Sequence, residues 1–590
     1  MNKNAVVVAA IILTSLLVSC ATPEPADLIL KNARIYTMDE AKPWASILVI
    51  KDQRILAVGD EALLEGFMGP TRDLNGAMVL PGFHDAHTHL AYGGRQLMQC
   101  DLHGIDTIVA IQEKLSACDA SLEPEDWLLG GGWNLSLFDE ANPHRALLDQ
   151  VNPERAMLLV GEDGHSSWAS TRALDLAGIS EETPNPSDGV IERDESGRPS
   201  GTLREKAQAL VQRFAPAMLF EDAEEGARRA IRMATSVGIT SAIDAATTDE
   251  DLAVYRSLER AGELPVRMVL AIAMNDPGLG LGARSAIDLA TRGDVNALRT
   301  DSAKIFVDGV LEGETAALLE PYDSHSGGHG HLNLSHEELT DLVSSLHAQD
   351  VQILFHAIGD LAVREALDSV ESAIETHGQR DARHHISHIQ LVDEADRARF
   401  AELGVSANMQ ALWAMPDPYI TQVNLPVVGQ HRVDAMYPFG SLVKQGARLA
   451  AGSDWSVSSM NPFMAIETAV TRSDADAVYP GVLNADEAVS LHQAIAAYTL
   501  EGAYLMHQEA DLGALKEGML ADLVVIDRNL FEIPPASIGD TQVLLTLLGG
   551  EVVYEHTVPA SSDEKEQEQE QEQEQEQEQE NDPTSVEEGS

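Results

Sequence analysis

The strongest constraint on the fold is a regular alternation of short apolar runs and helical stretches through the middle of the chain. Helical stretches such as 223–237 and 336–350 lie between several of the apolar runs. Strands that alternate with helices form parallel sheets, and about eight of them predict a (β/α)8 barrel, an α/β fold. The strands are expected at 78–84, 238–245, 266–273, 302–308, 351–356, 384–390, 405–411 and 448–454.

The rest of the globular part is predicted from what flanks or interrupts this alternation. Residues 27–78 and 507–558 both consist of short alternating runs separated by turns, and we expect them to form one small β-sandwich. The barrel then occupies 79–506. Within it, the span 95–222 is too long for one barrel connection and is expected to be an inserted subdomain over the barrel mouth.

The two ends of the chain are expected to lie outside the folded body. Residues 1–19 have a basic start, a short apolar stretch and a small residue before Cys20, which is typical of a bacterial lipoprotein signal. The resemblance to such signals implies that Cys20 is lipidated; an uncleaved anchor helix is the alternative. Residues 561–590 alternate Glu with Gln and contain almost nothing apolar, which predicts a disordered tail.

Composition excludes one class of partner. The chain has 590 residues and a net charge of −56, to which the Glu/Gln tail contributes only a small part. A body this acidic is repelled by phosphate backbones, so nucleic-acid binding is not expected. The acidity is better explained by solubility in a salty medium than by a cationic partner.

Three cysteines occur in the whole sequence. With Cys20 assigned to the signal, Cys100 and Cys118 remain, and in an oxidising compartment they permit one disulfide. Two buried, unpaired thiols are an equal alternative.

Residues with metal-binding side chains recur at the ends of the predicted strands. His87 and His89 are two residues apart, so a strand presents both on one face. The others follow in chain order at or near strand ends, the face on which barrel enzymes place their chemistry. Imidazole and carboxylate ligands suit zinc or a similar divalent ion. The full set is His87, His89, Lys304, His356, His388 and Asp454.

Lys304 is unusual in such a set because an ammonium group repels a metal ion. It becomes a ligand if its amine carries CO2 as a carbamate, which turns a cation into a pair of bridging oxygens. The alternative is an ordinary lysine paired with Asp308.

The chain from about 27 to 556 resembles the metal-dependent amidohydrolase superfamily. Within it, the chain is similar to amidohydrolase family 3, the branch that includes N-substituted formamide deformylase and YtcJ-type proteins. The matching sequences are LPGFHDAHTHL, KIFVDG followed by TAAL, FHAIGD, RHHISHIQ, AAGSDWSV and LGALKEGMLADLVVID.

The resemblance implies a role for each ligand. His87 and His89 would hold the more buried of two metal ions, and His356 and His388 the more exposed one. Lys304 would be the carboxylated bridge, and Asp454 would bind the first metal and act as the general base. A single-metal version, with Lys304 unmodified, is the alternative.

Several positions depart from the family pattern near the expected substrate. Relatives usually have Glu where this chain has Ser387, and they commonly have Gly-Ser and an Arg where this chain has Val310, Leu311 and Glu314. The specificity of a relative is therefore not transferred.

Three further residues are weaker candidates for substrate binding. His165, in GEDGHSSW, matches a family motif that lines the pocket; a locally bonded loop histidine is the alternative. Trp455 is expected either to wall the pocket or to pack against the barrel rim. Asp308 sits at a strand end, where it can also orient the metal ligands.

The expected function is hydrolysis of a non-peptide C–N bond in a small amide, formamide or cyclic amide, with one or two zinc ions. The alternatives are isomerisation or another hydrolysis at the same site, and an inactive barrel that serves as a binding lipoprotein. The expected location is the cell envelope, as a periplasmic or outer-membrane lipoprotein whose only membrane contact is its N-terminal lipid. Whether the chain forms a homo-oligomer is left open.

Overall fold

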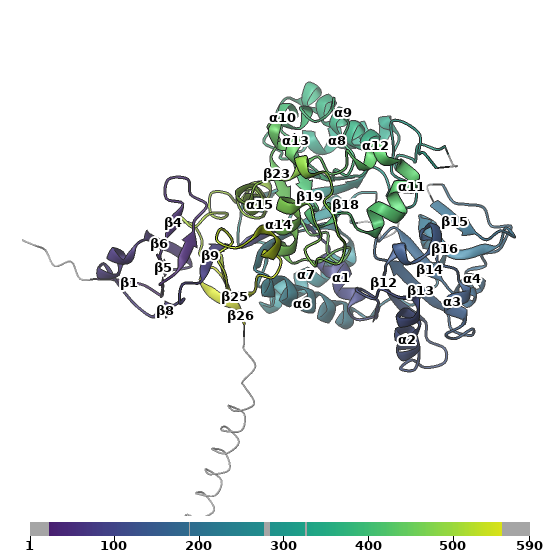
Figure 1. Ribbon diagram of the computed structural model, residues 1–590, viewed down its shortest axis with the longest axis horizontal. Helices are drawn as coiled ribbons and strands as arrows, with labels where there is room; N and C mark the ends of the chain where they lie inside the picture. Colours follow the sequence, from purple (N-terminus) through teal and green to yellow (C-terminus); the bar gives the residue numbers. More distant parts are fainter. Residues whose placement is uncertain (1–22, 188, 276–281, 283, 325–326, 557–590) are drawn as a thin grey trace, which may run out of the picture.

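The computed structural model describes residues 23–187, 189–275, 282, 284–324 and 327–556. The signal segment, Cys20 and the Glu/Gln tail lie outside these residues. Three bodies follow one another across Figure 1, with the sandwich at the left, the barrel in the centre and the inserted subdomain at the right. None of the helices within the described ranges is long and apolar enough to cross a membrane.

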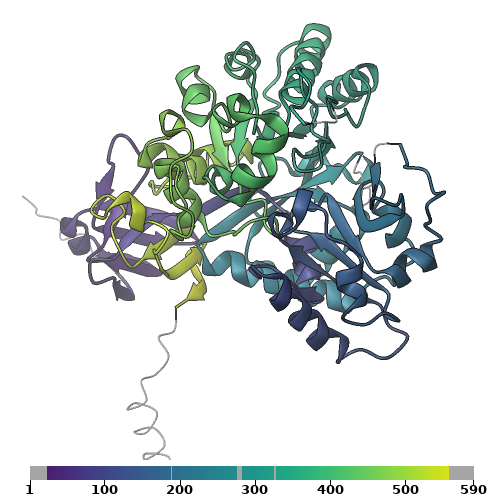
Figure 2. The ribbon, with the colours of Figure 1, turned by 45° about the vertical axis from the view of Figure 1, so that its right-hand side comes forward.

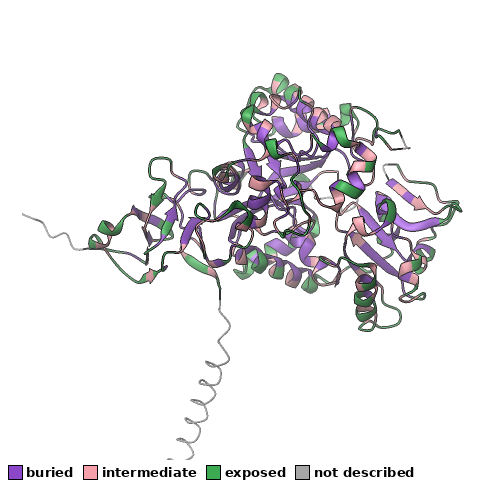
Figure 3. Ribbon diagram, in the orientation of Figure 1, coloured by how far each residue is buried: buried purple, intermediate pink, exposed green. Residues whose placement is uncertain are grey.

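The central body is an eight-stranded, all-parallel sheet whose strands follow in chain order, which confirms the predicted (β/α)8 barrel. Its strands are almost wholly buried, and the helices around them expose their outer faces (Figure 3). The strands are β10 (Phe83–Thr88), β17 (Ile239–Thr247), β18 (Arg267–Ala273), β19 (Arg299–Phe306), β20 (Gln352–Ala357), β21 (His385–His388), β22 (Ser406–Met409) and β23 (Leu449–Ala451).

The surrounding helices follow from amphipathic patterns with well-defined starts. In α6 (Phe220–Ser236), small and apolar residues recur every three to four positions and form the buried stripe. Both α7 (Asp249–Ala261) and α8 (His336–Ala348) begin at a capping box, at Thr248 and Ser335 respectively. A longer helix, α9 (Asp360–His377), follows β20.

One expected strand is divided between two sheets. The apolar run 78–84 is not a single barrel strand: β9 (Met78–Pro81) pairs antiparallel with β24 (Leu523–Ile526) in the sandwich, and β10 then starts the barrel. The boundary between sandwich and barrel therefore lies after Pro81, not at 78/79. The Pro81-Gly82 pair marks this change of sheet.

The sandwich is built from both ends of the chain. One sheet contains β6 (Arg54–Gly59), β5 (Ile47–Lys51), β2 (Leu28–Lys31) and β8 (Thr71–Asp73). The other contains β26 (Glu551–Glu555), β25 (Val543–Leu548), β24, β9, β3 (Arg34–Tyr36) and β4 (Trp44–Ala45). Leu30, Leu48, Val79, Leu523 and Leu547 share one core, so the two terminal segments bury each other's apolar faces.

The inserted subdomain has its own six-stranded sheet and apolar core. Turned by 45°, the structure shows this sheet beside the barrel (Figure 2). Cys100 and Cys118 form a disulfide that joins the first strand of the sheet to α2 (Ile108–Asp119). The strands are β11 (Cys100–Asp101), β12 (Leu128–Trp133), β13 (Met157–Gly161), β14 (Ser166–Ala169), β16 (Pro199–Glu205) and β15 (Gly189–Arg193).

Candidate metal centre and active-site cavity

The seam at which the barrel closes brings the first and last candidate ligands together. The backbone N–H of Asp454, just after β23, donates to the carbonyl of His87 on β10, at 2.7 Å. One carboxylate oxygen of Asp454 lies 3.3 Å from Nε2 of His87 and 3.0 Å from Nε2 of His89. These three residues offer ligand atoms within 4.8 Å of one another, a spacing that suits one metal ion.

The other predicted ligands surround this group. Nζ of Lys304 lies 3.4 Å from Nε2 of His87, and Nδ1 of His388 lies 3.8 Å from the second oxygen of Asp454. The rings of His356 and His388 are 4.5 Å apart between centroids. The structure thus brings together all six side chains that the sequence predicted as ligands at the strand ends.

Hydrogen bonds hold the histidines in the orientation that metal ligands need. Nδ1 of His87 lies 2.7 Å from the hydroxyl of Ser387, which leaves Nε2 directed at Asp454. Nε2 of His356 lies 3.1 Å from the carbonyl of Gly309. A ligating histidine ordinarily uses one ring nitrogen for the metal and the other for such a bond.

The ring nitrogens of His388, unpartnered in the described part of the chain, indicate that a metal ion fits this site. His388 is buried, and among the described residues neither of its ring nitrogens has a hydrogen-bond partner. An orphaned pair of buried imidazole nitrogens is costly unless a ligand satisfies it. His388 also stacks on Trp413, with the rings 5.4 Å apart and nearly parallel, so its ring plane is fixed. These side chains fit a divalent cation.

Burial sets the charge of the ligands. It lowers the pKa of His87 to about 3, with the neighbouring Lys304 acting in the same direction, and lowers the pKa of His356 and His388 well below the usual value. Neutral imidazoles have the lone pairs that a metal requires. Burial alone would raise the pKa of Asp454, but contacts with His87 and His89 hold it well below its usual range.

Two ligands sit in strained backbone. His388 has φ of 77° and Asp454 has φ of 54°, both in the left-handed region that side chains other than glycine rarely adopt. Such strain persists only where the surroundings enforce it. Asp85 provides part of that support, because its carboxylate accepts from the backbone N–H and the hydroxyl of Ser453.

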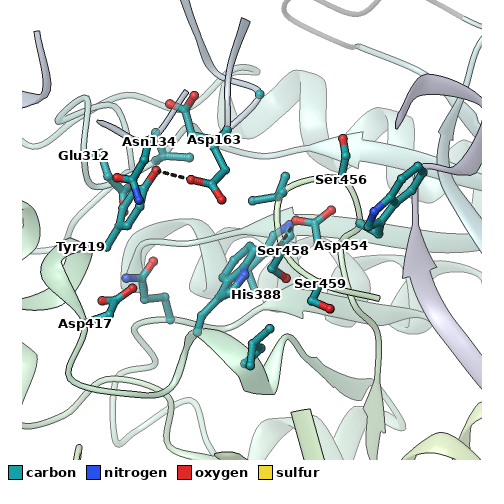
Figure 4. A pocket seen from close by; sticks show the side chains of 18 of the residues that line it. Asn134, Asp163, Glu312, His388, Asp417, Tyr419, Asp454, Ser456, Ser458 and Ser459 are labelled. Carbon is teal, nitrogen blue, oxygen red and sulfur yellow. Dashed lines mark hydrogen bonds and ion pairs between the residues drawn. The ribbon is translucent and has the colours of Figure 1, made fainter. Parts of the chain in front are cut away.

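The ligands lie at the base of a cavity of about 550 Å³ that the barrel loops and the inserted subdomain enclose. His388, Asp454 and three serines of the loop after β23 are seen in Figure 4. Trp455 lines the cavity and also packs on Gly93 of α1 (Leu90–Gln96), where an added Cβ would lie 2.5 Å from its ring. Both roles expected for Trp455 therefore apply.

His165 reaches the cavity from the inserted subdomain. Its Nδ1 lies 3.0 Å from the carboxylate of buried Glu205, and its ring is 5.2 Å from that of His356. Thr315, in the loop after β19, donates to the same carboxylate at 2.8 Å. The sequence predicted His165 but not Glu205, which lies forty residues further on in another strand.

Asp308 does not line the cavity and so does not have the substrate-binding role expected from the sequence. It is fully buried and is not among the described residues that line the cavity. Its carboxylate accepts from the backbone N–H groups of Ala317, Ile358 and Gly359, and lies 3.7 Å from Nε2 of His356. Asp308 therefore fixes the loops around His356.

A (β/α)8 barrel with neutral histidines, a lysine and an aspartate at the carboxyl ends of its strands defines the class of metal-dependent barrel hydrolases. The sequence profile of the amidohydrolase family matches residues 71–554. The chain belongs to this family.

Curated relatives and solved structures agree with this assignment. The YtcJ protein of Bacillus subtilis is 30% identical over 88% of this chain and 98% of its own length. The N-substituted formamide deformylase of Arthrobacter pascens is 28% identical over 90% and 99%. An uncharacterized metal-dependent hydrolase from Pyrococcus furiosus is 26% identical with a TM-score of 0.63, and covers 85% of this chain and 99% of its own.

Proposed function

We propose that the protein hydrolyses a non-peptide C–N bond in a small amide, formamide or cyclic amide, with zinc as its divalent metal. The observation that carries the proposal is the placement of Asp454 against His87 and His89 in a cavity of about 550 Å³. The similarity to a formamide deformylase along almost the whole chain supports the amide substrate.

The ligand sets follow from the positions of the side chains. His87, His89 and Asp454 would hold one ion, and His356 and His388 a second. Lys304, as the carbamate formed from its amine and CO2 with loss of a proton, would bridge them. An ion bound there polarises a carbonyl and lowers the pKa of water toward about 7.

Proton transfer and substrate binding would be carried out by side chains of the protein. The carboxylate of Asp454 is placed to take a proton from the attacking water and to deliver it to the leaving nitrogen. Glu205 holds Nδ1 of His165, so the Nε2 edge of that ring is turned toward the cavity and His356. His165 is placed to hydrogen-bond the carbonyl oxygen of the substrate, where charge develops.

The test is hydrolysis of a panel of N-substituted formamides, acetamides and cyclic amides by zinc-loaded protein and by an Asp454→Asn variant. We expect the wild type to release amine from at least one compound and the variant to be slower by about 10³-fold or more. Equal turnover by both proteins would overturn the assignment. Rearranged but unhydrolysed product would indicate isomerisation, and metal binding without turnover would indicate a binding protein.

We also propose that the protein is exported and anchored to the cell envelope through lipidated Cys20. The Cys100–Cys118 disulfide supports an oxidising compartment. Labelling with a radioactive fatty acid in the native host, with a Cys20→Ser variant as control, tests the anchor. Label in both proteins, or in neither, would contradict it.

A further inference from the structure

The cavity has a second chemical region, on the wall away from the metal ligands. Glu162 and Asp163 follow β13 of the inserted subdomain, Glu312 lies in the loop after β19, and Asp417 precedes the π-helix η7 (Tyr419–Asn424). Figure 4 shows Asp163, Glu312 and Asp417 around Tyr419, on the side opposite Asp454. We call Glu162, Asp163, Glu312 and Asp417 the acidic wall.

Within the described chain, positive side chains act on the acidic wall without an ion-pair contact: His103 acts on Glu162, and His165 and Arg204 act on Asp163. None of its four carboxylates forms an ion pair with a described Lys or Arg, whereas buried Asp251, Asp301 and Asp522 each do. Lys304 is the one Lys or Arg among the described residues that line the cavity, and it lies with the metal ligands. The overall acidity of the chain explains exposed carboxylates, but carboxylates that line a cavity require a different reason.

The acidic wall is electrostatically unfavourable without a positive charge. Burial raises the pKa of Glu162 to about 7, although the nearby His103 opposes this shift. Burial also raises the pKa of Asp417 to about 7, and the negative charge of Glu312 raises it further. Burial likewise raises the pKa of Glu312 and Asp163. A cation bound among these groups would relieve both the desolvation and the mutual repulsion.

An unsatisfied acceptor belongs to a side chain that lines the same region. The amide of Asn424 donates to Glu312 at 3.1 Å, so this side chain points into the acidic wall. Asn424 is 1% exposed, and its carbonyl oxygen has no hydrogen-bond partner among the described residues. A buried acceptor without a donor is costly, and a ligand N–H group would satisfy it.

The spacing of the carboxylates distinguishes a molecular cation from a metal ion. Among the described residues, only His87, His89 and Asp454 bring three ligand atoms within 4.8 Å of one another. The acidic wall is too open for a bare ion. The phenol ring of Tyr419, whose hydroxyl donates to Glu162 at 3.4 Å, offers an aromatic face of the kind that attracts organic cations.

We infer that the acidic wall binds a primary ammonium group of the substrate, so that the substrate is a small amide with an amine at the end remote from the C–N bond that is cleaved. This inference rests on the proposed function for the cleavage itself. The ammonium would donate hydrogen bonds to the carboxylates and to the carbonyl oxygen of Asn424.

The experiment uses three matched series of N-alkylformamides, in several chain lengths, whose remote end is an ammonium, a methyl or a carboxylate group. With zinc-loaded wild type, we expect kcat/KM for the best ammonium compound to exceed that of its methyl analogue by roughly ten- to hundredfold. The carboxylate series should be the poorest. In a Glu312→Gln variant, the preference should fall, because KM should rise more for the ammonium compound than for the methyl compound.

A Glu320→Gln variant is the matched control, because it removes an exposed carboxylate from the same loop. It should retain the full preference. A wild type that prefers the methyl or carboxylate series, or a Glu312→Gln variant with undiminished preference, would overturn the inference.

A binding measurement separates this inference from the proposed function. Calorimetry with the Asp454→Asn variant should detect the ammonium compound but not its methyl analogue, and Glu312→Gln added to that background should abolish the signal. If no formamide is hydrolysed but this binding is seen, the cleavage proposal fails and the ammonium site remains. If the methyl analogue binds equally, the ammonium site fails.

Discussion

The hydroxyl of Ser387 lies 2.7 Å from Nδ1 of His87, although the two residues are 300 positions apart. Ser387 is on β21 and His87 on β10, and both are buried. This contact fixes which ring nitrogen of His87 faces Asp454. A serine therefore performs, in this chain, the orienting task that a carboxylate or a carbonyl often performs for a metal-ligating histidine.

Loss of this contact should weaken metal binding. We expect Ser387→Ala to lower zinc affinity by about 10- to 100-fold, because His87 is no longer held in its ligating orientation. Competition with a chromophoric chelator measures the affinity. Ser302→Ala is the control, since Ser302 bonds Gln352 lower in the barrel. An unchanged affinity in Ser387→Ala would show that packing alone orients His87.

The proposed carbamate on Lys304 predicts a specific rescue. Lys304→Ala should retain at most one metal ion per chain, where the wild type retains two, and should lose most of its activity. Short carboxylic acids such as acetate should restore part of the metal content and part of the activity, because their carboxylate oxygens replace those of the carbamate. Elemental analysis of the purified proteins gives the stoichiometry. Full metal content in Lys304→Ala would contradict the bridge.

Removing the His165 imidazole should affect the chemical step more than binding. We expect His165→Asn to lower kcat by about 10²-fold with a KM that changes by a small factor. Glu205→Gln should show a smaller loss, because a neutral amide still accepts from Nδ1. His144→Asn is the control, since His144 lies in the same subdomain and outside the cavity lining. A loss confined to KM would assign His165 to binding.

The acidic wall should make the protein without substrate less stable as the pH rises. Glu162 has a pKa of about 7 in the folded state against an ordinary value of 4.5, so the folded protein holds its proton more tightly. The resulting loss in the free energy of unfolding is absent below pH 4.5, grows between pH 4.5 and about 7, and is complete above pH 7. We expect Glu162→Gln to raise the thermal midpoint at pH 8.5 by on the order of 1 °C or more.

The same substitution should have little effect on the midpoint at pH 4.5, where Glu162 is protonated when folded. Scanning calorimetry at the two pH values, without amide or amine present, makes the comparison. A gain of equal size at both values would assign the effect to packing and not to charge.

The sequence predicted the barrel and the positions of the six candidate ligands because both follow repeating rules. Each ligand adjoins an apolar run of strand length, and parallel strands must present their carboxyl ends on one face. Asp454 and His87 meet because the last strand closes on the first, which is a property of any eight-stranded barrel.

What the sequence did not predict depends on contacts between loops. Glu205 and the acidic wall come from separate connections, and no spacing in the chain relates Glu312 to Asp417. The division of 78–84 between two sheets was missed for a similar reason, since β10 follows β9 after a single residue and only the partner strands differ. The Pro81-Gly82 pair was the available signal.

The pairing of β9 with β24 has a consequence for how the molecule is made. A ribosome releases Met78–Pro81 some 440 positions before its partner strand β24, so β9 stays without this neighbour while most of the chain is synthesised. Its apolar face must meanwhile be shielded, for example by chaperones. A chain truncated before Leu523 would therefore leave the amino-terminal strands of the sandwich uncovered and prone to aggregation, even with a complete barrel.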